Sequence, residues 1–98
     1  MITVVLQDLT GKRIGDGVDV AWPMLPAETD SRFACLRFVD PYGDTVFNGI
    51  QAQYLEADLK LLIRESRNQE EVAIIEQLLS LASACQDHPH LYVRFIGD

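Results

Sequence analysis

The sequence predicts an α+β fold in which an antiparallel sheet of about four strands packs, in two layers, against a helical pair. Three observations predict it. Apolar and polar residues alternate over much of the first 40 positions, as in strands. Between positions 48 and 85 apolar residues recur every three to four residues, as in amphipathic helices. A final apolar run, Leu91–Ile96, returns to a strand pattern, so the element order is β-β-β-α-α-β.

The first two strands form a hairpin. Ile2, Val4 and Leu6 alternate with positions that include the polar Thr3 and Gln7, as in a strand with one buried face. A turn at Leu9–Lys12 leads into a second extended stretch, Arg13–Trp22. Because glycine weakens a strand interior, Gly15 and Gly17 indicate a β-bulge or an edge position in this second strand.

A loop with two prolines, Pro23–Arg32, precedes the third predicted strand, and it is longer than most connections. Phe33–Val39 carries apolar side chains on both faces, which favours a central strand. We expect the last strand of the chain to pair beside it. The turn formers Asp40, Pro41 and Gly43 then end this third strand.

Two amphipathic helices follow. The first begins at Asn48 and ends within residues 64–67, and the second begins after Asn68 and ends near Cys85. Each asparagine is followed three residues later by Gln or Glu, which is the pattern of a capping box.

The first helix has two apolar stripes, and a helix lying flat on a sheet needs only one. The second stripe, Ile50, Tyr54, Ala57 and Leu61, lies roughly opposite the core face. It is covered either by the second helix or the proline loop, or by another protein. We interpret Ile50, Tyr54 and Leu61 as a candidate partner surface, with Tyr42 at the turn as a further exposed aromatic anchor.

The length and the net charge of the chain limit the functions and partners that it can have. Ninety-eight residues make a single domain, 1–98, large enough to bury a core without a metal or a disulfide. The net charge of −7 gives no general attraction to nucleic acids or anionic membranes, so we expect neither as a partner. The first residues lack the pattern of a signal peptide, and no apolar run is long enough for a membrane span. We therefore expect a cytoplasmic protein with Cys35 and Cys85 reduced.

Two clusters of side chains offer an enzymatic alternative. In the first, Asp40, Asp44 and Asn48 are spaced by four residues and carry oxygen atoms of the kind that Ca²⁺ and Mg²⁺ bind. Aspartate and asparagine also stabilise turns and helix starts through bonds to the backbone, and we favour that role here.

In the second cluster, Cys85, His88 and His90 fall within six residues and are of the types that bind zinc. The sequence nominates no fourth ligand, and histidine near a helix C-terminus also interacts well with the helix dipole. We expect no metal and no other cofactor at either cluster.

Two segments carry a resemblance. They are Phe38–Asn48, with the pattern F-[VI]-D-P-Y-G-D-T-V-F-N, and His90–Asp98, with the pattern H-L-Y-x-x-F-x-G-D. Together with the two helices they resemble a group of small uncharacterised bacterial proteins, over roughly the C-terminal two thirds of the chain. The resemblance implies a bacterial cytosolic origin and one compact domain. It implies no activity and no catalytic residue.

The sequence favours a non-enzymatic, acidic protein-interaction module. A homodimer is one form of it, and an immunity or antitoxin-like protein that blocks a basic partner is another. For such a contact, the carboxylates Asp44, Glu56 and Asp58 join the apolar stripe on the candidate surface. The alternatives are a small metal-dependent or hydrolytic enzyme that uses either cluster, and a structural subunit of a larger assembly.

Overall fold

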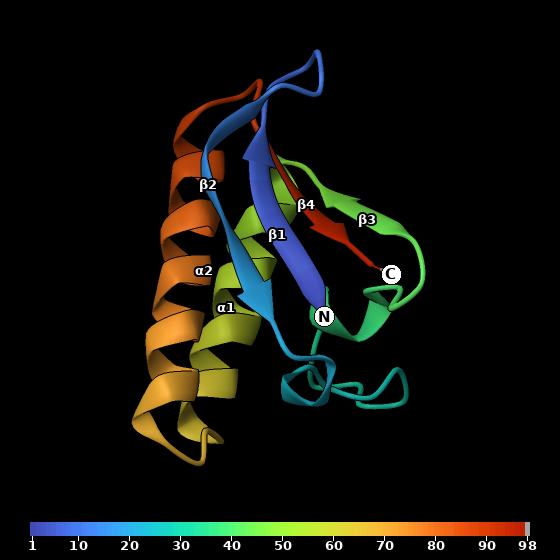
Figure 1. Ribbon diagram of the computed structural model, residues 1–98, viewed down its shortest axis with the longest axis vertical. Coiled ribbons are helices and arrows are strands. Elements are labelled where there is room, and N and C mark those ends of the chain that lie inside the picture. Colours follow the sequence, from blue (N-terminus) through green and yellow to red (C-terminus); the bar gives the residue numbers. More distant parts are fainter. Residues whose placement is uncertain (98) are drawn as a thin grey trace.

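The predicted fold class is confirmed. The computed structural model describes residues 1–97, and in it two helices pack against one face of a four-stranded antiparallel sheet (Figure 1). The strand order is β2-β1-β4-β3, so the first and last strands of the chain lie in the centre of the sheet. The elements are β1 (Ile2–Gln7), β2 (Arg13–Val20), β3 (Asp44–Phe47), α1 (Gly49–Arg64), α2 (Gln69–Asp87) and β4 (Tyr92–Ile96).

The third strand lies later in the chain than the sequence predicted. Phe33–Val39 is not a strand: it forms turns and a short 3₁₀ helix, η2 (Leu36–Phe38), and the strand follows at Asp44–Phe47. The last strand therefore pairs with β1 and β3 and not with residues 33–39. The apolar pattern arose because Phe33 and three further side chains of this segment are buried, although its backbone is irregular.

The hairpin, its bulge and its edge position are as predicted. β2 is an edge strand, and the register between β1 and β2 shifts between Val4 and Leu6, where three residues of β2 lie opposite one residue of β1. Gly15 within this bulge has a φ of +73°, a conformation that glycine adopts without strain.

Both helices begin at the predicted asparagines. Asn48 Oδ1 accepts a hydrogen bond of 2.9 Å from the Gln51 N–H, and Gln51 Oε1 accepts one of 2.9 Å from the Asn48 N–H, which completes a capping box. Asn68 Oδ1 accepts from the Glu71 N–H at 2.9 Å. The Glu71 carboxylate in turn accepts from the Arg67 N–H at 3.2 Å, one residue earlier than in a standard box.

The core lies between the sheet and the two helices. The rings of Phe47 and Phe95 meet edge to face with centroids 5.7 Å apart, which joins the β3 edge to the central strands. Within residues 1–97, no helix combines the length and the apolar composition needed to cross a membrane. The buried apolar residues of the strands and of α1 and α2 are Ile2, Val4, Val5, Leu6, Val18, Val20, Phe47, Ala52, Leu55, Leu59, Ile75, Leu78, Ala82, Cys85, Val93 and Phe95.

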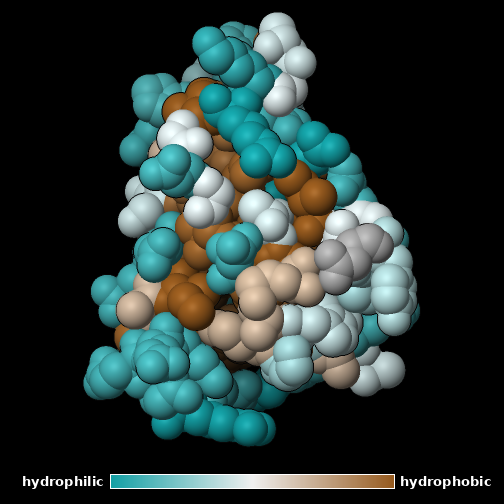
Figure 2. Space-filling view, viewed as in Figure 1, coloured by the Kyte–Doolittle hydropathy of each residue, from teal (hydrophilic) through white to brown (hydrophobic). Residues whose placement is uncertain are grey.

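The sheet lies in front of α1 in the view of Figure 1, so this view shows the face of the sheet that the helices do not cover. Arg94 on β4 pairs with Asp44 on β3, and the Thr3 hydroxyl donates to Asp19 at 2.9 Å. From the same side, Figure 2 shows hydrophobic residues down the middle and hydrophilic residues at the top and bottom.

Candidate functional site

One buried carboxylate holds the segment that was predicted as a strand. Asp58 lies on α1 and is only 4% exposed. Its oxygens accept hydrogen bonds from the N–H groups of Ala34 (3.0 Å), Cys35 (2.7 Å) and Leu36 (2.9 Å). These three bonds take the place of the strand ladder that the segment lacks. Asp58 is therefore enclosed, and it does not contribute a carboxylate to an exposed partner surface.

The three oxygen side chains of the first cluster have separate local roles. Asp40 Oδ1 accepts from the Tyr42 N–H at 2.8 Å, Asp44 pairs with Arg94, and Asn48 caps α1. Within residues 1–97, no three His, Cys, Asp or Glu side chains are grouped so that they could hold a metal ion. The cluster therefore consists of a turn, an ion pair and a helix cap.

The cysteines are buried thiols, and the second cluster is not assembled around them. Burial and, to a smaller extent, the nearby charge of Asp58 together raise the pKa of Cys35 to about 11. Burial also raises the pKa of Cys85, whose thiol donates to the Leu91 carbonyl at 3.2 Å. His88 and His90 are exposed. A thiol with a raised pKa is a poor nucleophile and a poor metal ligand at neutral pH.

This burial predicts slow labelling of the native thiols. With a pKa of about 11, Cys35 has roughly one thiolate in a thousand at pH 8, and its side chain is also enclosed. We expect both cysteines to react with a chromogenic disulfide reagent at pH 8 only as fast as the chain opens. In guanidinium chloride both should react at the rate of free cysteine. A native thiol that reacted at the denatured rate would contradict the burial.

The two segments that carry the resemblance meet at one end of the sheet. The Gly97 N–H donates to the Gly43 carbonyl at 2.8 Å. A Cβ at Gly97 would lie 2.6 Å from the carbonyl oxygens of Gly43 and Pro41 and 2.7 Å from that of Asp40. Only glycine fits so close to these three carbonyls, and the contact holds the junction turn against the end of β4. Asp98, the last residue of the second segment, lies outside the described residues.

The second stripe of α1 faces solvent over most of its length. Ile50 is 73% exposed and Tyr54 is 54% exposed, and Ala57 is exposed beside them. Leu61, the fourth member, is half-buried and packs against the core. Neither α2 nor the proline loop covers the first three side chains, so α1 presents an apolar face, defined by Ile50, Tyr54, Ala57 and Leu61, that we call the outward face.

A hollow lies at the N-terminal end of the outward face. It has a volume of about 510 Å³ and is lined by Ile50, Gln53 and Gln86 together with residues of the helix ends. The Gln86 side chain donates to Glu56 at 2.5 Å. This hydrogen bond, and then Lys60 at 3.0 Å, lower the pKa of Glu56. Glu56, which the sequence assigned to a basic partner, is therefore already engaged within the chain.

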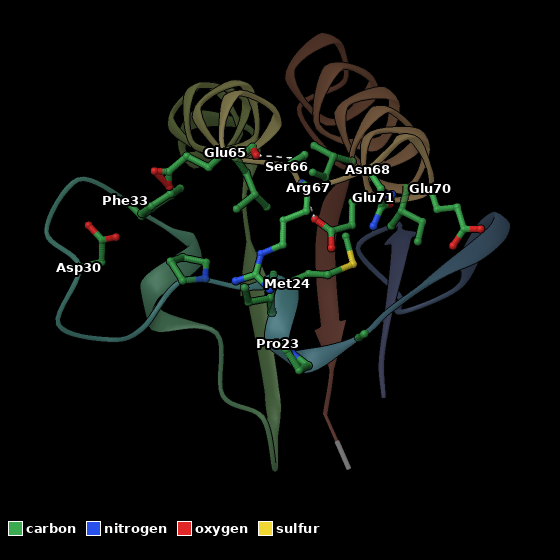
Figure 3. A pocket seen from close by; sticks show the side chains of 16 residues that line it. Pro23, Met24, Asp30, Phe33, Glu65, Ser66, Arg67, Asn68, Glu70 and Glu71 are labelled. Carbon is green, nitrogen blue, oxygen red and sulfur yellow. Dashed lines mark hydrogen bonds between the residues drawn. The ribbon is translucent and has the colours of Figure 1, made fainter.

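A second cavity lies at the other end of α1, and sequence reasoning missed it. It has a volume of about 470 Å³ and is enclosed by the proline loop, the C-terminal end of α1 and the first turns of α2 (Figure 3). Arg32 joins two of these walls, because its guanidinium bonds to Asp30 at 2.8 Å and to Glu65 at 2.8 Å. The hydrogen bond from Arg32 lowers the pKa of Asp30. The one sequence signal for this cavity is the unusual length of the loop Pro23–Arg32.

The structure thus separates the predicted partner residues. Ile50 and Tyr54 share one exposed face, and Leu61 ends it half-buried. Tyr42, 82% exposed, lies on the junction turn and not on α1.

The chain matches no protein-family model, no curated protein and no solved structure closely enough to indicate a relationship.

Proposed function

We propose that this chain is a non-enzymatic protein-interaction module that forms a homodimer through the outward face of α1. The observation that carries the proposal is the exposure of Ile50 (73%) and Tyr54 (54%) on a helix whose opposite face is already buried. Large apolar side chains grouped on one exposed face are typical of a protein contact, because covering them removes apolar area from water.

The spacing of the outward face suits a second copy of the same helix. Positions 50, 54, 57 and 61 follow the four-three-four spacing of the apolar seam in a coiled coil. When two such helices pair antiparallel about a two-fold axis, Ile50 faces Leu61 of the second copy and Tyr54 faces Ala57 of the second copy. The large tyrosine then packs against the small alanine, so the face is complementary to itself.

The charged side chains beside the outward face do not repel one another in this arrangement, although each chain carries a net charge of −7. On one flank lie Gln53, Lys60 and Arg64, and the carboxylate of Glu56 is paired with Lys60. In the antiparallel arrangement Lys60 comes close to Gln53 of the second copy, so no like charges are opposed. Arg64 of the second copy arrives at the hollow beside Ile50, where amide oxygens can accept its hydrogen bonds.

The contact should be weak. The seam spans twelve residues from Ile50 to Leu61, about 16 Å of helix. It buries less than the roughly 1,600 Å² of a standard interface, so we expect a dissociation constant in the ~10 μM range or above.

Concentration-dependent ¹⁵N–¹H spectra locate the contact. As the protein is concentrated through this range, the amides of Ile50, Tyr54 and Ala57 should shift or broaden. Tyr42, a still more exposed aromatic residue outside the face, should stay constant and is the internal control. Spectra that do not change, or changes that centre on the β3 edge, would contradict the proposal.

The net charge of −7 supports a basic protein as a further partner of such a module, as in an immunity or antitoxin-like role. The carboxylates that the sequence assigned to that contact are engaged within the chain: Asp44 by Arg94, Glu56 by Lys60 and Gln86. Other carboxylates of the chain would therefore have to bind a basic partner.

A further inference from the structure

The cavity between the proline loop and the helical hairpin has an apolar floor. Met24 and Leu25 come from the loop, and Leu62, Ile74 and Ile75 come from the two helices (Figure 3). With a volume of about 470 Å³, the cavity is large enough for one long side chain of another molecule. An apolar floor favours a ligand with a hydrocarbon body.

The rim of the cavity is acidic. Arg32 is bonded to two of its carboxylates, and Arg67 is the only cation that itself lines the cavity among residues 1–97. The rim has four carboxylates and these two guanidinium groups, so its net charge is −2. The four carboxylates are Asp30, Glu65, Glu70 and Glu71.

Arg67 already lies in this cavity. Figure 3 shows its side chain extending from the connection between the helices across the opening, towards Met24. Within residues 1–97 its guanidinium makes no ion pair and no hydrogen bond, and the residue is exposed. The cavity thus already accommodates a hydrocarbon stem over its floor, and no carboxylate of the rim holds the Arg67 guanidinium there.

We propose that this cavity binds an arginine or lysine side chain of a basic protein partner, beside Arg67 and on the Glu70 side of the floor. The stem of the incoming side chain covers Met24 and Ile74, and its cationic group lies near Glu70, which has no ion pair within residues 1–97.

An anionic group is disfavoured in the cavity, although α2 begins beside it. The Asn68 cap and the Glu71 carboxylate already satisfy amides of this helix start, and the acidic rim repels negative charge. The proposal goes beyond the homodimer: the cavity lies at the C-terminal end of α1, away from Ile50, so either contact can exist without the other.

Three short peptides test the proposal by titration of the full ¹⁵N-labelled chain. They share the frame acetyl-Gly-Leu-X-Leu-Gly-amide, with X arginine, its neutral isostere citrulline, or glutamate. The arginine peptide should give saturable shifts at the amides of Met24, Phe33 and Glu70. Because an exposed charge pair contributes at most ~1 kcal/mol, citrulline should bind about 3- to 5-fold more weakly and glutamate not measurably.

Two variants of the chain sharpen the test. Arg67→Ala removes a neighbouring positive charge and should tighten the arginine peptide about 3-fold, whereas Glu70→Gln should weaken it about 3-fold. Glu76→Gln is the matched control, because Glu76 is an exposed carboxylate of the same helix that does not line the cavity. It should leave the affinity unchanged. The urea midpoint of each variant reports whether it is folded.

Several outcomes would overturn the proposal. Equal affinity for the citrulline peptide would mean that charge is not recognised, and tighter binding of the glutamate peptide would mean that the cavity takes anions. Absence of saturable shifts with all three peptides would mean that the cavity takes no such side chain. If hexylammonium ion bound as tightly as the arginine peptide, the cavity would be a site for small amphipathic cations and not for a protein partner.

Discussion

Asp58→Ala should lower the free energy of unfolding by about 3–5 kcal/mol. The variant leaves the amides of Ala34, Cys35 and Leu36 without an acceptor in a part-buried site, since Asp58 accepts all three at 2.7–3.0 Å. Each buried donor that loses its partner costs ~1–3 kcal/mol. The loss is a large fraction of the ~5–15 kcal/mol that stabilises a typical domain.

Urea denaturation followed by circular dichroism measures this loss. Asp58→Asn retains one acceptor oxygen and should lose about half as much. The control is Glu76→Gln, an exposed carboxylate of α2, which should stay within ~0.5 kcal/mol of the wild type. An Asp58→Ala variant as stable as this control would mean that the three hydrogen bonds do not hold residues 34–36.

The double variant Ile50→Glu/Tyr54→Glu should raise the dissociation constant of the homodimer at least ~100-fold. In the antiparallel arrangement it places four carboxylates in one short apolar seam, and the two at position 54 face Ala57 and must lose water without gaining a cation. The fold should be retained, because both side chains are more than half exposed in the single chain. Sedimentation velocity over a range of concentrations measures the change.

The matched control is Tyr42→Glu, which introduces the same charge at an aromatic residue of the junction turn and should dimerise as the wild type does. Ala57→Glu is a second disruptive variant at the predicted centre of the seam. Leu61 is less suitable, because it is half-buried and packs on the core. A folded double variant that dimerised as tightly as the wild type would show that the outward face is not the contact.

Local signals made most of the fold predictable from the sequence. The helix starts at Asn48 and Asn68 were predicted because a capping residue and its partner lie three positions apart. The bulge and edge position of β2 were predicted from its glycines, one of which, Gly15, has a positive φ. Each of these features depends on residues that are neighbours in the chain.

The third strand was misplaced because a distant residue decides the conformation of Phe33–Val39. The apolar side chains on both faces of this segment fit a central strand, but the amides of residues 34–36 bond to Asp58, 22 to 24 positions later. The true strand, Asp44–Phe47, has only four residues and directly follows a turn, so it gives little periodicity of its own.

The candidate site was predictable in part for the same reason. Helical periodicity identified the outward face of α1, but only the packed structure shows that Ile50 and Tyr54 are uncovered while Leu61 is half-buried. The cavity beside Arg67 was not predictable, because its walls come from the proline loop, the end of α1 and the start of α2. No local pattern brings these three segments together.

The most direct test of the homodimer is the solution mass of the wild-type chain by light scattering, from about 1 μM to 1 mM. We predict a mass that rises from 11.0 kDa towards twice that value as the concentration increases. A mass that remains at 11.0 kDa at the highest concentration would contradict the central claim. A mass that rises past the dimer would favour the structural subunit of a larger assembly.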